Sequence, residues 1–182
     1  MCTPGAAATS MSMDAADSPE TLARLYGPLV FRAAYRVLGD STLAEDAQQE
    51  VFMRLLQTPR HGVEAWPAYL TAAATRTAID MLRRQRRWWG VLPLWKVLAP
   101  TAAPSAECMG IRDQEAAQLR AAIAGLPKQQ ARCFAMRYLE GLEIADIALA
   151  LGLSENNVGV ILHRARRRLE ARLGTAREED PR

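Results

Sequence analysis

Near the C-terminal end of the chain, asparagine, histidine and arginine side chains gather on one segment that could bind nucleic acid. The candidate residues are Ser154, Asn156, Asn157, His163, Arg164, Arg166, Arg167 and Arg168. Asparagine can form paired hydrogen bonds with the edge of adenine, and arginine can hold a phosphate or grip guanine. A helix with a purely structural role would more often mix glutamate and lysine here. The residue types therefore favour a DNA contact, with an unliganded basic surface helix as the alternative.

Presenting these side chains to DNA requires two helices joined at a tight turn. An apolar stripe at helical spacing predicts the first helix over residues 143–151. Gly152 follows where the backbone must turn sharply, and Ser154 is placed to cap the second helix. The small Ala148 lets the two helices approach, and the branched Val158 fills the angle between them. This spacing is typical of a helix-turn-helix.

A second basic surface is expected on a long helix over residues 64–87. Four side chains at helical spacing share one face of it, opposite its apolar stripe: Arg76, Asp80, Arg83 and Arg87. Aromatic residues stand on both sides of the basic run: Trp66, Tyr69, Trp88 and Trp89. Cations interleaved with aromatic rings suit a single strand, because phosphates pair with arginine and unstacked bases stack on rings. These residues fit equally well a solvated basic helix end with its tryptophans in the core.

Acidic side chains mark the polar side of an amphipathic helix expected over residues 42–57. Asp46, Gln49 and Glu50 lie on that side, and Phe52 lies near its border. By itself this pattern is that of an ordinary surface helix. The acids have no histidine or cysteine partner, and the chain has no nucleophile–base pair or phosphate-binding loop. An enzyme is therefore not expected.

The composition points away from metal, cofactor and membrane chemistry. The 182 residues carry a net charge of +3 at a pI of about 9.0. Cys2, Cys108 and Cys133 are far apart, and neither His61 nor His163 is near enough in sequence to suggest a zinc site. We expect no metal, no disulfide framework and no cofactor. With no signal peptide and no apolar run near ~20 residues, a cytoplasmic protein without membrane insertion is expected.

Helix start and stop signals give the organisation of the chain. Ser18 and Pro19 begin a first helix that Gly39 ends, and Thr42 begins a second helix with the spacing of a capping box. Segment 90–111 holds three prolines and loses the helical period, which predicts a linker.

Two small helical domains are expected on either side of this linker. The N-terminal domain covers residues 18–89, and the C-terminal helix-turn-helix domain covers residues 112–173. Residues 1–17 are expected to be a disordered tail, and residues 174–182 a second tail. No strand-like alternation occurs in the sequence, so the predicted fold class is all-α.

Four segments of the chain, taken in order, resemble the extracytoplasmic-function (ECF) group of bacterial sigma factors. They are LYGPLVFRAAYRVLGD, AEDAQQEVFMRLL, AWPAYLTAAATRTAIDMLRRQRR and AIAGLPKQQARCFAMRYLEGLEIADIALALGLSENNVGVILHRARRRL. The resemblance covers residues 18–172. It is more specific than a helix-turn-helix alone, because unrelated segments match in the right order across a proline-containing linker.

The resemblance implies a subunit that binds core RNA polymerase and directs it to promoter DNA. In this family the second helix docks on the largest polymerase subunit, and the implied contacts are Asp46, Gln49, Glu50 and Phe52. The third helix binds the minus-ten element as a melted strand. Its implied contacts are Thr75, Arg76, Asp80, Arg83, Arg84 and Arg87. The helix-turn-helix residues named first would bind the minus-thirty-five duplex, and an anti-sigma factor is left open as a further partner.

The chain departs from the family pattern at three places. The family often has asparagine where this chain has Arg76, near a pocket for a flipped base, so the preferred base is open. Residues 159–161 are Gly-Val-Ile in place of a common Lys-Ser-Arg, which removes two cations and puts a glycine inside a helix at a cost of ~1 kcal/mol. The apolar segment 88–95 has no explanation from the pattern.

A stand-alone helix-turn-helix regulator is the alternative function. In that case the N-terminal domain would serve dimerisation or sensing. The two functions differ in partner dependence, because a sigma factor binds promoter DNA specifically only together with core polymerase.

Overall fold

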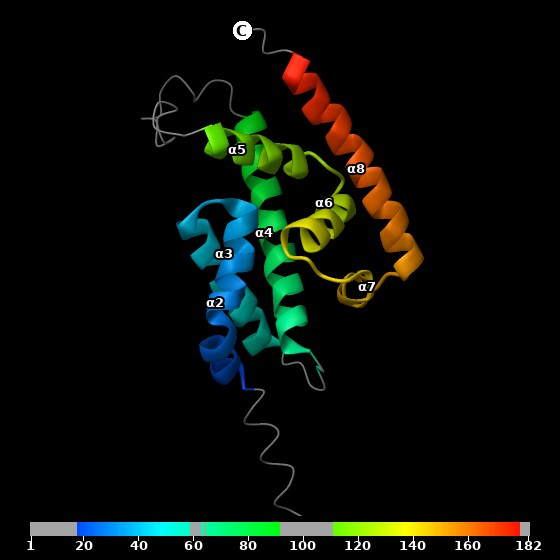
Figure 1. The fold of residues 1–182 in the computed structure, drawn as a ribbon. Helices are drawn as coiled ribbons and strands as arrows, with labels where there is room; N and C mark the ends of the chain where they lie inside the picture. The colour runs from blue at the N-terminus through cyan, green and yellow to red at the C-terminus, as the bar shows by residue number, and fades with distance from the viewer. Residues whose placement is uncertain (1–17, 59–62, 64, 92–110, 179–182) are drawn as a thin grey trace, which may run out of the picture.

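The computed structural model describes residues 18–58, 63, 65–91 and 111–178, whose arrangement is shown in Figure 1. All regular structure in these residues is helical, which confirms the all-α prediction. The α-helices are α2 (Pro19–Leu38), α3 (Ser41–Gln57), α4 (Trp66–Val91), α5 (Ile111–Ala124), α6 (Lys128–Phe134), α7 (Ile144–Leu151) and α8 (Glu155–Glu178). A π-helical turn, Ala135–Leu139, continues α6.

The ends of α2 follow the sequence signals, whereas the start of α3 does not. The Ser18 hydroxyl accepts a hydrogen bond from the Thr21 amide at 3.3 Å, and Gly39 ends α2 with a φ of 70°. The prediction that Thr42 caps α3 is wrong, because α3 begins at Ser41. Its cap is Asp40, whose carboxylate accepts from the Leu43 amide at 2.9 Å.

Helix α4 continues further than the sequence predicts. It includes residues 90 and 91, which were expected to belong to the linker. Neither residue 90 nor residue 91 is a proline, so both can donate the backbone hydrogen bond that extends the helix. The first proline after them is Pro93. The predicted tail 1–17 and linker residues 92–110 lie outside the described residues, and α8 runs on to residue 178, past the predicted end of its domain.

Helices α2, α3 and α4 form an N-terminal bundle with its own apolar cluster. Its buried members are Leu22, Val30, Ala33, Val51, Leu55, Trp66, Leu70 and Ala74. Trp66 is only 9% exposed and meets Tyr69 edge-on, with ring centroids 5.7 Å apart. The Trp66 ring is therefore a core side chain in this structure, which favours the structural alternative for this tryptophan over base stacking.

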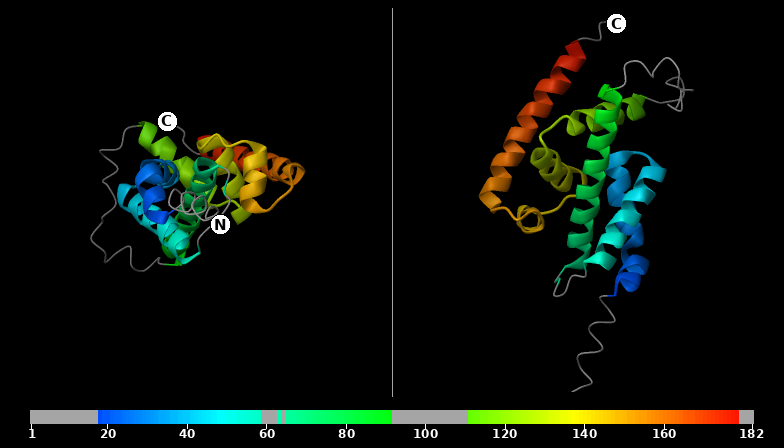
Figure 2. Two further views of the ribbon diagram at one scale, coloured as in Figure 1. Left: turned by 90° about the horizontal axis from the view of Figure 1, so that it is seen from below. Right: turned by 180° about the vertical axis from the view of Figure 1, so that it is seen from behind.

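The two predicted domains pack directly against each other. One apolar cluster joins Ala34 and Ile79 of the N-terminal bundle with Ile123 and Leu126 at the end of α5. The views in Figures 1 and 2 agree that α6 lies between α4 and α8. Side chains from both domains are consequently buried in a shared interface, which the sequence pattern did not predict.

The helix-turn-helix has the predicted geometry. Gly152 ends α7 with a φ of 65°, and the Ser154 hydroxyl accepts from the Asn157 amide at 3.3 Å. Ala148 and Val158 are both buried where the helices meet. Among the described residues, no single helix is long and apolar enough to cross a membrane. Helix α7 with Glu155–Leu173 passes that test only as a pair bent by 101°.

Candidate nucleic-acid and protein-binding surfaces

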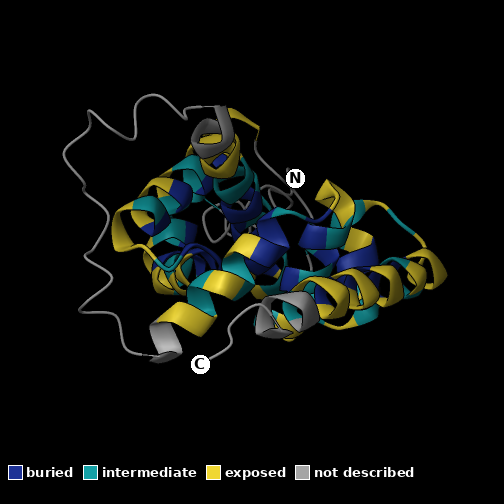
Figure 3. Cartoon of the chain, turned by 90° about the horizontal axis from the view of Figure 1, so that it is seen from above, coloured by how far each residue is buried: buried dark blue, intermediate teal, exposed yellow. Residues whose placement is uncertain are grey.

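Helix α8 turns its polar residues to solvent and its apolar residues to the core. Val158, Leu162 and Ala165 are buried. The predicted contacts on the opposite side are all exposed: Asn156, Asn157, His163, Arg164, Arg166, Arg167 and Arg168. Figure 3 shows exposed residues mixed with buried and intermediate ones along the helices. Ser154 differs from the other candidates, because its hydroxyl is engaged as the cap of α8.

A shallow hollow of about 510 Å³ lies where α7 meets the first two turns of α8. Its lining residues are Ile144, Glu155, Asn156, Gly159, Val160, His163 and Arg164. Sequence reasoning had not assigned Glu155 or Val160 to a surface, and Val160 is 41% exposed. A Cβ atom on Gly159 would meet no atom within 4 Å, so internal packing does not require glycine at this position.

The predicted minus-ten residues on α4 have very different environments. Arg84 and Arg87 are exposed, and Arg76 is partly buried. Thr75 is fully buried and its hydroxyl donates to the Thr71 carbonyl at 2.8 Å. The geometry does not support Thr75 as a DNA contact, because its polar atom faces its own helix.

Two of these α4 side chains hold the C-terminal domain. The Asp80 carboxylate accepts from Arg132 of α6 at 2.7 Å and lies 3.3 Å from the Lys128 ammonium. Arg83 donates to the carbonyls of Ala124 and Leu126, where α5 has ended. In this structure these two residues therefore face the C-terminal domain and not solvent, which the sequence pattern did not predict. They contribute to the domain interface.

A third polar contact joins α2 to the C-terminal domain. Arg36 of α2 donates to Glu140, which follows the π-helical turn, at 3.0 Å. The Glu140 side chain is only 3% exposed. Burial raises the pKa of Glu140 above its ordinary value, although the Arg36 charge opposes that shift. The ion pair thus stabilises a charge that the interface otherwise disfavours.

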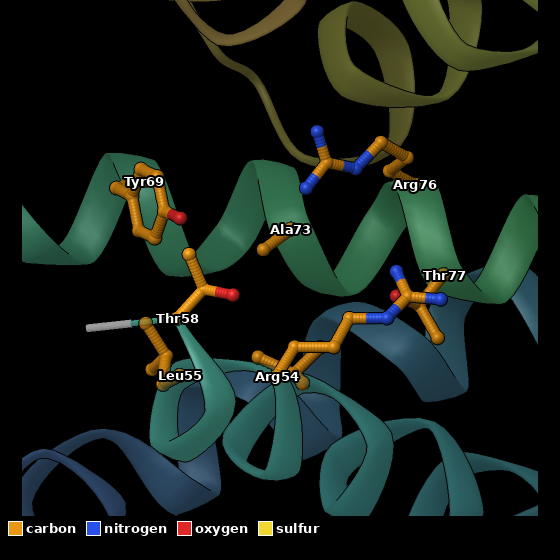
Figure 4. A pocket seen from close by; sticks show the side chains of 8 residues that line it. Arg54, Leu55, Thr58, Tyr69, Ala73, Arg76 and Thr77 are labelled. Atoms are coloured by element: carbon orange, nitrogen blue, oxygen red, sulfur yellow. The ribbon is translucent and has the colours of Figure 1, made fainter. Parts of the chain in front are cut away.

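Helices α3 and α4 enclose a cavity of about 170 Å³ beside the basic face of α4. It is lined by Val51, Arg54, Leu55, Thr58, Tyr69, Ala73, Arg76 and Thr77. Figure 4 shows Arg54 reaching from α3 toward Thr77 and Arg76 reaching along α4. Burial lowers the pKa of the Arg76 guanidinium, and the positive charge of Arg132 adds to the effect. Only Arg76 of these residues was predicted as a DNA contact.

The exposed side of α3 combines acidic and apolar side chains. Asp46 and Gln49 are exposed as predicted. Glu50 is less free, because it forms an ion pair with Arg54 one turn later. Phe52 is half-buried and packs on the cluster of the N-terminal bundle.

A hollow of about 490 Å³ adjoins these residues. It is lined by Glu45, Gln48, Gln49, Phe52, Met53 and Leu56. Met53 and Leu56 were not predicted as contacts, yet they are 53% and 51% exposed. The sequence did contain a signal for them: Met53 and Leu56 follow Gln49 at helical spacing, so these two apolar side chains share the polar side of α3. Exposed large apolar side chains grouped in one hollow are typical of a protein-binding surface.

Comparisons with known proteins agree with this geometry. The chain matches the family model of sigma-70 region 2 over residues 22–87 and that of sigma-70 region 4 over residues 116–169. These ranges correspond to the α2–α4 bundle and to the helix-turn-helix domain.

Curated relatives include two ECF RNA polymerase sigma factors. SigE from Mycolicibacterium smegmatis is 29% identical over 152 residues, covering 82% of this chain and 59% of the relative. BldN from Streptomyces coelicolor is 29% identical over 147 residues, covering 79% and 56%. The chain thus spans a little over half the length of these relatives.

Two solved structures share the fold at low sequence identity. CnrH in complex with the cytosolic domain of CnrY has a TM-score of 0.58 at 17% identity, covering 90% of this chain and 94% of that chain. The sigma factor RpoE bound to the anti-sigma factor NepR from Bartonella quintana has a TM-score of 0.52 at 19% identity, covering 85% and 96%. With both sigma-70 regions matched in order, the chain belongs to the ECF group of RNA polymerase sigma factors.

Proposed function

We propose that this chain binds core RNA polymerase and directs it to specific promoters, where it recognises and melts DNA without catalysis of its own. The observation that carries the proposal is that one chain has three different surfaces. Helices α4 and α8 each carry a basic surface, and α3, which precedes them in the chain, carries an acidic and apolar one. Helix α8 suits a duplex and α4 suits a single strand, while α3 suits a protein. Such a protein acts where the chromosome is, in the cytoplasm.

The polymerase would dock on the α3 surface. Its exposed acid Asp46 lies on the same helix as the exposed apolar pair Met53 and Leu56, a combination that would bury apolar area and select a basic partner. Asp46→Arg should cost the complex a few kcal/mol if the contact is desolvated. Glu20→Arg, on an exposed position of α2, is the matched charge reversal.

A pull-down with core polymerase tests this docking surface. We expect wild type and Glu20→Arg to co-purify with polymerase and Asp46→Arg to be depleted, with all three equally folded by circular dichroism. Equal recovery of the two variants would contradict the assignment of α3.

The promoter contacts would be divided between α8 and α4. The exposed asparagines and arginines of α8 would bind the minus-thirty-five duplex, and Arg76, Arg84 and Arg87 would hold the melted minus-ten strand. Asp80 and Arg83 could join them only after the C-terminal domain moves away, because their polar atoms are now bonded to it. Use of Asp80 or Arg83 in promoter melting would therefore require this interface to open, whereas Arg84 and Arg87 are exposed with the domains packed.

A partner protein of the anti-sigma class is proposed for the same chain. The support is that both structural neighbours above were solved as complexes with other proteins, one of them named an anti-sigma factor. A stand-alone regulator stays the alternative function. Specific promoter binding by the chain without core polymerase would favour it.

A further inference from the structure

Three arginines of α4 line a hollow of about 280 Å³ beside the end of α5. They are Arg83, Arg86 and Arg87, and the other described lining residues are Ala124 and Gly125. Figures 1 and 2 show α5 lying across the C-terminal part of α4. The volume is just below the roughly 300 Å³ at which pockets for drug-sized ligands begin. The hollow has room for a small ligand, and its arginines attract a negatively charged one.

A fourth guanidinium reaches the same place from the C-terminal domain. A Cβ atom on Gly125 would collide with Nη1 of Arg86 from α4 and with Nη1 of Arg172 from α8. Both nitrogens thus lie over one glycine, within about 4 Å of each other. Guanidinium groups stay charged in proteins, so two positive charges meet here across the domain interface.

Gly125 provides the space for this meeting. Its φ is outside the left-handed region, which among the described glycines is adopted by Gly39, Gly141 and Gly152. The backbone at residue 125 therefore does not require glycine. The two guanidiniums do require it, because any side chain at this position would displace them.

The end of α5 holds these arginines but offsets little of their charge. The Arg83 guanidinium donates to the carbonyls of Ala124 and Leu126, and Arg172 Nη1 donates to the Ala122 carbonyl at 3.4 Å. The C-terminal end of a helix carries about half a negative charge. Since each guanidinium carries a full positive charge, the helix end alone does not neutralise the group.

We propose that this hollow binds the phosphate groups of a small oligophosphate, and that the bound anion bridges α4 of the N-terminal domain and α8 of the C-terminal domain. Arginine suits phosphate because its planar fork donates two parallel hydrogen bonds, and several forks around one hollow suit more than one phosphate group. Inorganic pyrophosphate and the phosphate chain of a nucleotide share this chemistry. The site does not depend on the proposed function, because it needs neither polymerase nor DNA.

Calorimetric titration of the full chain with inorganic pyrophosphate tests the site, at constant ionic strength and without magnesium. We expect saturable binding of one anion per chain and a higher melting temperature, because a ligand that binds only the folded chain stabilises it. Orthophosphate should bind more weakly, since it engages fewer of the arginine forks. Weak, unsaturable binding of both anions would overturn the proposal.

A nucleoside triphosphate in the same titration distinguishes the two sources of phosphate. Affinity equal to that of pyrophosphate assigns the site to the phosphate chain alone. Tighter binding of the nucleoside triphosphate assigns it to a whole nucleotide. Binding of neither compound would overturn the proposal.

Two variants that remove one guanidinium each test the bridge. Arg86→Gln acts on α4 and Arg172→Gln on α8, and each should weaken pyrophosphate binding by on the order of tenfold. Arg32→Gln, at an exposed arginine of α2, is the matched control and should leave the affinity unchanged. Loss of affinity with Arg86→Gln alone would confine the anion to α4, and equal affinity of all three variants would remove the site. Either result would overturn the proposal.

Gly125→Ala gives a readout that diffuse electrostatic attraction would not produce. It keeps every charge but places a methyl group where the two guanidiniums meet. The affinity for pyrophosphate should therefore fall several-fold, with the circular dichroism spectrum unchanged. Unchanged affinity would overturn the proposal, because charge alone would then attract the anion. If this variant folds poorly, the two arginine variants still decide the question.

A short single-stranded oligonucleotide is the last arm of the test, because the proposed function assigns Arg83 and Arg87 to a melted strand. If the hollow is only part of that strand surface, Arg86→Gln should weaken oligonucleotide binding, Arg172→Gln should not, and pyrophosphate should not bind. That pattern would overturn the inference and leave the proposed function intact. Pyrophosphate binding by a chain that forms no holoenzyme with core polymerase would support the inference and overturn the proposed function alone.

Discussion

The ion pair between Asp80 and Arg132 offers a direct test of the domain interface. It joins α4 to α6 across 2.7 Å, and its side chains are 23% and 17% exposed. In a double-mutant cycle, Asp80→Ala, Arg132→Ala and the double variant are compared with the wild type. The cycle isolates this pair even though Asp80 also contacts Lys128, because loss of that second contact is common to both Asp80 variants.

The expected coupling follows from the partial burial of the pair. Exposed ion pairs contribute about 0.2–1 kcal/mol, and hydrogen bonds to charged groups contribute about 1.5–3 kcal/mol. Since both side chains are less than one quarter exposed, we expect a coupling near 1.5–2 kcal/mol. Asp80→Ala alone should cost more, about 2–3 kcal/mol. It leaves the Arg132 charge partly buried, and Arg132 Nε already lacks a partner.

Urea unfolding followed by tryptophan fluorescence and circular dichroism measures these free energies. The matched control is Arg166 with Glu170, an exposed pair on α8 at 3.8 Å, whose coupling should stay below about 0.5 kcal/mol. A coupling for Asp80 and Arg132 no larger than that of the control would refute the reasoning, because it would mean that the two domains do not meet at this surface in solution.

Three further predictions concern single residues. Gly159→Ala should raise the free energy of unfolding by about 0.5–1 kcal/mol in thermal or urea denaturation, because a Cβ there meets open space; lower stability would show that the helix needs the glycine. Ser154→Ala should lower stability by about 1 kcal/mol through loss of the α8 cap, and an unchanged unfolding midpoint would contradict that role. Burial raises the pKa of Glu140, so protonation of this side chain favours the folded state. This contribution to stability is complete below about pH 4.3, the ordinary pKa of glutamate, and is lost as the pH rises through the higher pKa of the folded state. Glu140→Gln should remove that loss in an unfolding series from acid to neutral pH, and parallel curves for both proteins would argue against it.

Local patterns predicted the helix-turn-helix correctly because its determinants are close in sequence. Gly152 must adopt a positive φ, Ser154 must cap, and Val158 must fill the angle, and each requirement involves neighbours within a few residues. The same locality explains the small error at α3. Asp40 and Thr42 both lie near the helix start, and propensity alone does not decide which oxygen reaches a free amide.

The contacts made by the polar side chains of α4 could not be predicted from local sequence patterns. Asp80 and Arg132 are separated by 52 residues, and nothing in their spacing indicates that they meet. A basic residue on a helix face is compatible with solvent, DNA or a second domain. The two threonines show the same limit: Thr75 is satisfied by its own helix and Thr77 is not, although both are buried polar residues on α4.

The contacts of Asp80 and Arg83 make the domain interface and the proposed strand surface of α4 compete for the same side chains. Arg83 cannot donate the same N–H to the carbonyls at the end of α5 and to a phosphate of a melted strand. Any partner that binds the α4 strand surface through Arg83 must therefore offset the lost domain contacts, including the coupling expected for Asp80 and Arg132. A partner that binds both domains in the packed arrangement has no such cost. The domain interface thus favours partners that bind the chain with its two domains packed over partners that must separate them.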